Sequence, residues 1–298
     1  MPTPLVRLDA PEAEAEIWLK LECLQPIGSF KLRGAANAIR SAPAEAVARG
    51  IVTASAGNMA QGVAWMAREL GVPARIVVPE HAPEAKLEAI ARLGGTVVKV
   101  PYERWWQAIE ESRYDELPGL FVHPVMDERV MAGNGTIGLE LAEELDEIDA
   151  VLIPWGGGGL TTGIASALAA LAPRTRVLVC EPETGAPVSA SLAAGEPVAV
   201  DYRPSFVDGA GSKGLLAPMW ERARPLLAGA HAVPLEEAAA AVRLLAQRAR
   251  VVAEGAGALG VAVALAGRAG AGRVVCVVSG GNIDASRLAA ILEGRVPD

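Results

Sequence analysis

The sequence predicts an α/β protein with parallel sheets, divided into two domains. From about residue 50 onward, short β-rich apolar runs alternate with helical stretches, which is the order of βαβ units. Several helical stretches are followed by glycine, the residue most common at the position that ends a helix. The chain has 298 residues, more than the roughly 100–200 residues of one typical domain. We therefore expect two α/β domains.

The first block of the pattern contains three predicted strands and two predicted helices. Apolar β-rich runs predict strands at 51–55, 75–78 and 96–100, and helical spacing predicts helices at 58–70 and 83–93. Gly71 and Gly94 follow these two helices, as C-cap glycines do.

The second block lies in the C-terminal half. Its predicted strands are 150–154, 176–180 and 274–278, its predicted helices are 160–171, 235–250, 256–267 and 285–292, and its least regular part is 195–219. No low-complexity linker separates the blocks, so we expect the chain to cross between domains. We place a small domain at 47–129, inserted in a large domain formed by 1–46 and 130–298.

Composition excludes several classes of function. A net charge of −8 argues against binding of nucleic acid, which needs a basic surface. No run of about 18 apolar residues suits a membrane span, and the first residues do not resemble a secretory signal, so we expect a cytoplasmic protein. Cys23, Cys180 and Cys276 lie in apolar stretches, which predicts reduced core thiols.

Lysine is scarce, because the basic residues are almost all arginine. The motif GSFKLRGA places Lys31 directly before small residues suited to helix packing. A lysine acts as a Schiff-base nucleophile when it is partly desolvated and deprotonated, and this setting can provide that. The alternative is a solvated lysine at a helix start. The other lysines are Lys20, Lys86, Lys99 and Lys213.

Two turns follow predicted strands and open predicted helices. SAGNMAQG, residues 55–62, leaves backbone N–H groups that suit a carboxylate, although an ordinary N-cap is the alternative. Four consecutive glycines at 156–159 can wrap an anion, and we expect phosphate. They lack the GK[ST] ending of a nucleoside-triphosphate loop.

A third turn, SGGN at 279–282, also lies between a predicted strand and a predicted helix. Ligands of open α/β sheets gather at the carboxyl ends of strands, so the three turns can converge on one ligand. The stretch 255–260 matches GxGxxG, but no acidic residue follows at the distance that holds a ribose, which favours a helix-packing face over a dinucleotide site.

In this order and spacing, GSFKLRGA, SAGNMAQG, GGGGL and SGGN closely resemble the threonine/serine dehydratase family of fold-type-II pyridoxal-phosphate enzymes. The similarity runs over essentially the whole chain. It implies two three-layer α/β/α domains with the cofactor between them. A short N-terminal helix and a C-terminal regulatory domain found in relatives have no counterpart, so we expect no feedback control through such a domain.

The resemblance also implies roles for individual residues. Lys31 forms the Schiff base, Phe30 lies against the cofactor ring, Asn58 bonds the ring hydroxyl and Ser279 meets the pyridine nitrogen. The phosphate and the substrate carboxylate are each held by a loop: Gly156, Gly157, Gly158, Gly159 and Leu160 for the phosphate, and Ser55, Ala56, Gly57, Asn58 and Met59 for the carboxylate. A neutral serine cannot stabilise a protonated pyridine ring, which suits elimination.

The implied reaction converts L-threonine, or a related 3-hydroxy amino acid such as L-serine, into a 2-oxo acid and ammonia. Lys31, once released from the cofactor, removes the α-proton, and the hydroxyl leaves after protonation through the cofactor phosphate. Asp127 matches a position near the substrate hydroxyl in relatives, and a solvated acid at a helix start is the alternative. We take Lys31, Ser55 and Asp127 as catalytic.

The sequence departs from the family pattern at two positions of the site. Met59 stands where histidine is common, but a carboxylate bound by backbone N–H groups does not need that side chain. Trp155 replaces a small apolar residue, and its bulk could reshape the substrate pocket, as could Trp105 and Trp106, with packing in the core or on the surface as the alternative.

A cation site is also implied by the resemblance. Glu181 and the backbone of Gly185 match part of the site in relatives. Pro187 stands where Mg²⁺-dependent members supply a carboxylate, which favours a monovalent cation.

Other functions on the same fold are rivals. A serine racemase-like isomerase needs a serine as proton carrier where this chain has Ala56, and a cysteine-synthase-like transferase has KDR where this chain has Lys31-Leu32-Arg33. A ligand-binding sensor would have no reason to keep Lys31. The substrate could also be 3-hydroxyaspartate or phenylserine. We expect a homodimer that acts on a small amino acid.

Overall fold

The computed structural model describes residues 1–298, which form two compact units. Unit 1 consists of Met1–Ser29 with Gly135–Asp298, and unit 2 consists of Phe30–Asn134. The domain bounds predicted from the sequence differ from these at residues 30–46 and 130–134, and they stay a prediction. None of the helices combines the length and the apolar character that crossing a membrane requires.

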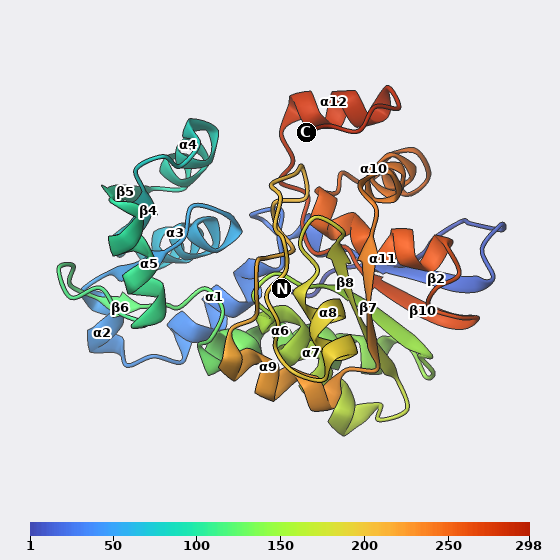
Figure 1. The fold of residues 1–298 in the computed structure, drawn as a ribbon. Coiled ribbons are helices and arrows are strands. Elements are labelled where there is room, and N and C mark those ends of the chain that lie inside the picture. The colour runs from blue at the N-terminus through green and yellow to red at the C-terminus, as the bar shows by residue number, and fades with distance from the viewer. The chain divides into compact units, whose positions relative to one another are not determined.

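Unit 1 is built on six strands, which are β1 (Leu5–Arg7), β2 (Ala15–Lys20), β7 (Ala150–Pro154), β8 (Arg176–Pro182), β9 (Gly229–Val233) and β10 (Gly272–Val277). They form one sheet in the order β1-β2-β10-β7-β8-β9, in which only β1 runs antiparallel to its neighbour. Figure 1 labels β2, β10, β7 and β8 of this sheet. Every residue of β7 is buried, as expected for a parallel strand covered on both faces.

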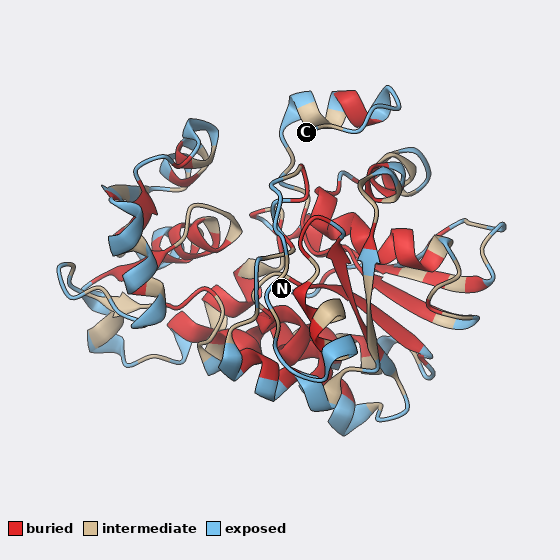
Figure 2. Ribbon diagram, viewed as in Figure 1, coloured by how far each residue is buried: buried red, intermediate tan, exposed pale blue.

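The helices of unit 1 lie on both faces of this sheet. They are α7 (Gly159–Leu171), α8 (Pro187–Ala194), α9 (Ala217–Ala223), α10 (Leu235–Leu244), α11 (Gly255–Leu265) and α12 (Ala285–Leu292), with short turns η1 (Glu22–Leu24), η2 (Arg224–Leu226) and the π-helix η3 (Leu245–Ala249). α11 is buried along nearly its whole length and packs on the sheet, as Figure 2 shows in red. Along β8, Leu178 and Cys180 join the core beneath α11, whereas Val179 faces α8 and α9.

Unit 2 has a parallel sheet in the order β5-β4-β3-β6. Its strands are β3 (Ile51–Ala54), β4 (Ala74–Pro79), β5 (Gly95–Val100) and β6 (Leu120–Phe121), and its helices are α1 (Lys31–Arg40), α2 (Ala44–Ala48), α3 (Asn58–Leu70), α4 (Glu84–Arg92) and α5 (Tyr102–Glu110). α3 packs on the sheet and on α1, and α5 covers the cluster that contains Val52, Val77 and Ala108. One further helix, α6 (Glu128–Glu144), belongs to both units, because unit 2 ends at Asn134 and unit 1 resumes at Gly135.

The predicted fold class is confirmed, and most predicted elements end within two residues of the observed ones. One predicted helix, 235–250, corresponds to two observed elements: α10 ends at Leu244, and the π-helix η3 follows it directly as far as Ala249. Arg250 then has φ +59°, a left-handed conformation that no α-helix continues through. The three cysteines are buried and unpaired, as predicted.

Candidate active site

Lys31 is the first residue of α1 in unit 2. Its Nζ donates a hydrogen bond of 2.8 Å to the carbonyl oxygen of Pro124 and lies 5.3 Å from the centroid of the Phe30 ring. Burial lowers the pKa of Lys31 from 10.5 to about 8, because the ammonium loses hydration. A substantial fraction of this amine is therefore uncharged near pH 8, as a nucleophile or base requires.

Two other lysines have acidic partners. Lys20 is fully buried between Glu140 and Glu144, with its Nζ 2.7 Å from a carboxylate oxygen of each. Lys99 pairs with Glu84 at 3.6 Å. The surroundings therefore distinguish Lys31 from these two ion-paired lysines.

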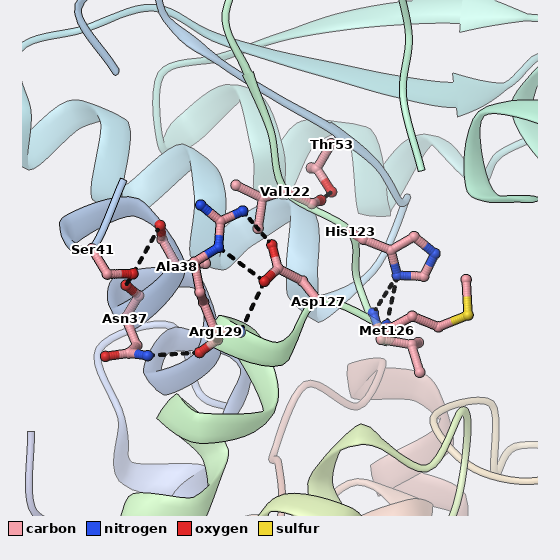
Figure 3. Close-up of polar contacts among 10 residues, drawn as sticks. Asn37, Ala38, Ser41, Thr53, Val122, His123, Met126, Asp127 and Arg129 are labelled. Carbon is pink, nitrogen blue, oxygen red and sulfur yellow. Dashed lines mark hydrogen bonds and ion pairs between the residues drawn. The ribbon is translucent and has the colours of Figure 1, made fainter. Parts of the chain in front are cut away.

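The Pro124 carbonyl, which accepts the hydrogen bond from Lys31, belongs to residues 122–129, here called the 122–129 segment. At its start, the Val122 N–H donates to the Val52 oxygen and the Val122 oxygen accepts from Oγ1 of Thr53, both at 2.8 Å. At its end, Nδ2 of Asn37 donates to the Arg129 oxygen at 2.7 Å (Figure 3). The segment is thus tied to β3 and to α1, the helix that carries Lys31.

His123 holds the turn that contains Pro124. Its Nδ1 accepts hydrogen bonds from the N–H groups of Val125, at 3.0 Å, and Met126, at 2.7 Å (Figure 3). Its Nε2 lies 3.1 Å from the Ile109 carbonyl oxygen, which can only accept, so Nε2 carries the proton. Burial lowers the pKa of His123, and the charge of Lys31 adds to this effect. The imidazole is therefore neutral, with both nitrogens engaged.

Asp127 pairs with Arg129 across the first turn of α6. Its Oδ1 accepts from the backbone N–H of Arg129 at 2.9 Å and from Nε at 3.0 Å, and its Oδ2 accepts from Nη2 at 2.7 Å (Figure 3). Burial favours a higher pKa for Asp127, but the hydrogen bonds and charge of Arg129 outweigh it and the pKa lies below its ordinary value. Asp127 is an ionised helix cap in this arrangement.

The loop from Ser55 to Met59 opens α3. Oγ of Ser55 accepts from the Gly57 N–H at 3.2 Å, and a hydroxyl that accepts can still donate its own proton. The Gln61 N–H makes the first bond inside the helix, to Gly57, so the N–H groups of the preceding turn point out of the helix end. α3 carries no acidic residue in its first turn, whereas α4 and α5 do. This end suits an anion.

Two contacts relate this loop to the rest of unit 2. Met59 is 1% exposed and belongs to the buried core. A Cβ at Gly62 would lie 3.3 Å from the Lys31 carbonyl oxygen, so α3 and α1 approach closely at Lys31. Unit 2 therefore brings together Lys31, Phe30, the α3 N-terminus and the 122–129 segment with Asp127.

In unit 1, the tetraglycine loop joins β7 to α7. Gly158 has φ +92°, and a Cβ there would lie 2.6 Å from Cη2 of Trp155. Trp155 is 1% exposed and packs with Val179, Val188 and Trp220, so its indole lies in the core beneath the loop. The structure therefore favours the core alternative for Trp155. Trp105 also packs in a core cluster, whereas Trp106 is exposed on α5.

This loop has the features of a phosphate cradle. α7 has 13 residues, begins after Gly158 and has no acidic residue in its first turn. The hydroxyls of Thr161 and Thr162, in that turn, are buried and have no hydrogen-bond partner. The backbone N–H groups of a helix N-terminus, the room left by missing side chains and the two buried hydroxyls fit the phosphate of the cofactor.

Ser279 follows β10, which pairs with β7, so Ser279 and the tetraglycine loop lie at the same edge of the sheet. Ser279 is 2% exposed. A Cβ at Gly281 would lie 2.5 Å from the Val252 backbone oxygen, so this position requires glycine, and a Cβ at Gly280 would lie 2.4 Å from Oε1 of Glu254 and displace that side chain. Unit 1 therefore brings Ser279 together with Gly156–Leu160.

Glu181 has another set of partners. Its Oε1 accepts from the Val188 N–H at 2.9 Å, and its Oε2 accepts from the N–H of Ser189 at 2.9 Å and from its Oγ at 3.0 Å. Burial raises the pKa of Glu181. The Gly185 oxygen accepts from the Ser212 N–H at 3.3 Å. No group of three His, Cys, Asp or Glu side chains is placed to hold a metal ion, and the cation stays a prediction.

Comparison with known proteins decides the family. Residues 1–280 match the family model described as "Pyridoxal-phosphate dependent enzyme". The chain belongs to this family. Its fold class and the predicted family resemblance are thereby confirmed, and the residues of the two sites fit the cofactor that gives the family its name.

Three similar proteins illustrate the range of the family. An L-threonine ammonia-lyase of Thermotoga maritima is 41% identical over 280 residues, covering 93% of this chain and 70% of the relative. The processed threonine deaminase isoform 2 of Solanum lycopersicum has a TM-score of 0.89 at 32% identity, covering 99% of this chain and 88% of that one. Maize serine racemase has a TM-score of 0.89 at 30% identity, with 98% and 92% covered.

Several residues of this pyridoxal-phosphate enzyme were not singled out by the sequence. They are His123, Arg129 and Glu254. The pairing of Asp127 with Arg129 could have been found, because an aspartate before a helix predicts an N-cap and its partner is two residues away. No sequence signal connects Ile109 with His123.

Proposed function

We propose that the protein is a pyridoxal-phosphate-dependent lyase that converts L-threonine, or a related 3-hydroxy amino acid such as L-serine, into a 2-oxo acid and ammonia. The observation that carries the proposal is the Lys31 amine, whose pKa burial lowers to about 8, in a chain of this family. The threonine ammonia-lyase at 41% identity supports the substrate class.

Residues of unit 2 bind the substrate and move its proton in this proposal. Ser55 and the N–H groups of Ala56–Met59 bind the substrate carboxylate, because the α3 N-terminus offers backbone N–H groups and positive potential. Lys31 carries the cofactor and, once released, removes the α-proton, and its lowered pKa makes it an effective base near pH 8. Phe30 packs against the cofactor ring, and Asn58 bonds the ring hydroxyl.

Residues of unit 1 hold the cofactor. Gly156–Leu160 bind its phosphate, with the α7 N-terminus supplying the N–H groups, and Ser279 bonds the pyridine nitrogen. When bound, pyridoxal phosphate supplies the electron sink that makes the α-proton of an amino acid acidic. A serine hydroxyl leaves the pyridine nitrogen less charged than an aspartate would, which favours elimination over reactions that need a long-lived carbanion.

Asp127 does not donate a proton in this proposal. Both of its oxygens are bonded to Arg129 and its pKa is below the ordinary value, so it is ionised at neutral pH. Its ionised carboxylate can therefore accept a hydrogen bond from the substrate hydroxyl while it caps α6.

A racemase is the second candidate, because maize serine racemase shares the fold at 30% identity. A racemase needs an acid on the face of the substrate opposite the lysine. The methyl group of Ala56, the residue at the position where this acid is expected, carries no proton. Elimination is the better-supported reaction.

The preferred substrate is L-threonine. The Trp155 indole lies in the core, which removes the main reason for expecting a ring-stacking substrate such as phenylserine. An added methyl group in a fitted apolar pocket contributes about 1–3 kcal/mol of discrimination. The monovalent cation, the homodimer and the cytoplasmic location stay predictions.

The test is a comparison of kcat/KM for L-threonine, L-serine, 3-hydroxyaspartate and 3-phenylserine, with the 2-oxo acid as product. We expect 2-oxobutyrate from threonine at the highest kcat/KM. The Trp155→Val variant should be less stable but keep the same order of substrates, because the indole packs in the core. A clear preference for serine contradicts the threonine assignment, and no 2-oxo acid from any of the four contradicts the lyase.

A further inference from the structure

Lys31 and His123 are connected through one carbonyl group. The Pro124 oxygen accepts from Nζ of Lys31 at 2.8 Å, and Pro124 lies between His123 and the two residues whose N–H groups His123 binds. A proline has no N–H of its own and a restricted φ, so the direction of its carbonyl depends on the turn that follows. That turn is fixed by the imidazole.

We propose that His123 is a positioning residue for Lys31, acting through the carbonyl group of Pro124. The inference rests on the proposed function, in which Lys31 is released from the cofactor to move the α-proton. During that step the amine needs an acceptor that leaves it pointing at the substrate. The Pro124 carbonyl is this acceptor, and it also stabilises the ammonium that forms when the proton arrives.

Both nitrogens of the His123 imidazole are engaged in hydrogen bonds within the protein, which argues against a direct proton transfer between His123 and the substrate. Two N–H donors occupy Nδ1 and the Ile109 carbonyl occupies Nε2, so a proton exchange with substrate would break the turn. The charged groups near it are Lys31, Asp127 and Arg129, and the last two neutralise each other. His123 is also 3% exposed, which keeps water away from these bonds.

The 122–129 segment is also held by hydrogen bonds on either side of the turn at Pro124. The Thr53–Val122 bond holds the segment to β3 one residue before His123, and Asn37 holds it after Asp127. Loss of the Thr53 hydrogen bond should therefore lower the stability of the protein without changing the direction of the Pro124 carbonyl. This difference separates a positioning role from a structural one.

The experiment compares His123→Asn with His123→Gln. Asparagine can place its side-chain oxygen on the N–H groups two and three residues ahead, as Nδ1 does, whereas glutamine has the same amide displaced by one methylene. Thr53→Val is the control for loss of one buried hydrogen bond in the same segment. All variants are measured as full-length holoenzyme with L-threonine and with α-deuterated L-threonine.

We expect His123→Gln to lower kcat by about 10- to 100-fold with little change in KM, because a small displacement of the base affects proton transfer more than binding. The deuterium isotope effect on kcat should rise. His123→Asn should restore most of kcat and the original isotope effect, and Thr53→Val should lower Tm while keeping both. Equal kcat and isotope effects in the Asn and Gln variants would overturn the proposal.

A second readout does not depend on turnover. In the full chain without cofactor, ¹³Cε-labelled lysine gives five signals to assign, and that of Lys31 titrates with its pKa. The bond to Pro124 favours the ammonium, so its loss in His123→Gln should lower the titration midpoint by about 0.5–1 unit, with His123→Asn near wild type. An unchanged midpoint in His123→Gln contradicts the inference, whereas absence of 2-oxobutyrate in wild type contradicts only the proposed function.

Discussion

The indole of Trp155 fills the space that a side chain at Gly158 would occupy, because a Cβ there would lie 2.6 Å from Cη2 of the ring. The bulky residue and the glycine are therefore coupled, and the tetraglycine loop rests on the core cluster of Val179, Val188 and Trp220. This coupling makes the shape of the tetraglycine loop, the proposed phosphate site, sensitive to position 158.

We predict that Gly158→Ala weakens binding of pyridoxal phosphate by at least about tenfold. A left-handed φ of +92° costs alanine about 1–2 kcal/mol, and the methyl group also displaces either the loop or the indole. Gly195→Ala is the matched control, because Gly195 has φ +81° and nothing within 4 Å of its Cβ position. Equal cofactor Kd values in the two variants, measured by absorbance titration, would show that the contact with Trp155 does not matter.

Removal of the buried amine should stabilise the cofactor-free protein. The folded-state pKa of Lys31, about 8, lies below the ordinary 10.5, so the folded state binds fewer protons than the unfolded state between these pH values. The free energy of unfolding of wild type therefore rises with pH in this window, and the cost of burying the ammonium is largest below pH 8. Lys31→Met should be more stable than wild type by about 1–3 kcal/mol at pH 7.

The same comparison has a clear contrary outcome. The stability difference between wild type and Lys31→Met should shrink as pH increases from 8 to 10.5, measured by denaturant unfolding of cofactor-free protein. A difference that is constant over this range, or a less stable methionine variant at pH 7, would mean that burial does not lower the pKa of Lys31.

Asp127→Asn tests the assignment of Asp127 as a cap rather than an acid. Asparagine can still cap α6 but loses the ion pair with Arg129, so we expect a stability loss of about 1 kcal/mol and a fall in kcat of less than about tenfold. The acidic limb of the pH profile of kcat/KM should not move, since Asp127 is ionised above its lowered pKa. A fall of more than about 100-fold in a folded variant would instead make Asp127 an essential acid or base.

Ala56→Ser should create racemisation, because a hydroxyl at position 56 supplies the missing proton carrier. With L-serine in deuterated water, wild type should give pyruvate and little D-serine, and the variant should give measurable deuterated D-serine. Ala56→Val adds bulk without a proton and serves as the control. The role assigned to position 56 is wrong if wild type already forms D-serine as fast as pyruvate.

Much of the fold was predictable because its elements are long, periodic and bounded by glycine. α3, β7 and α12 match the predicted ranges residue for residue, and Gly71, with φ +67°, ends α3 as expected. α6 was not predicted, because its face is made of small residues such as Gly133 and Gly135, which have little hydrophobic periodicity and low helix propensity. β9, with the sequence GAHAV, has little β-propensity and forms only through pairing with β8.

Some residues of the candidate site could also be predicted from the sequence, and others could not. Lys31 and the tetraglycine loop could be found from local sequence, because glycine, lysine and strand-to-helix order carry their chemistry. The roles of His123 and Trp155 depend on packing: Ile109 comes from α5, which was not predicted, and the cluster around Trp155 comes from three separate elements. Contacts of this kind have no signature in the local sequence.

The central claim is that Lys31 carries the cofactor, and borohydride reduction followed by peptide mapping tests it most directly. Holoenzyme reconstituted with pyridoxal phosphate should be yellow, and reduction should make the linkage permanent. We predict the pyridoxyl mass on the peptide that contains Lys31 and on no other. A label on Lys20, Lys86, Lys99 or Lys213, or a colourless protein with no label after reconstitution, would contradict the account.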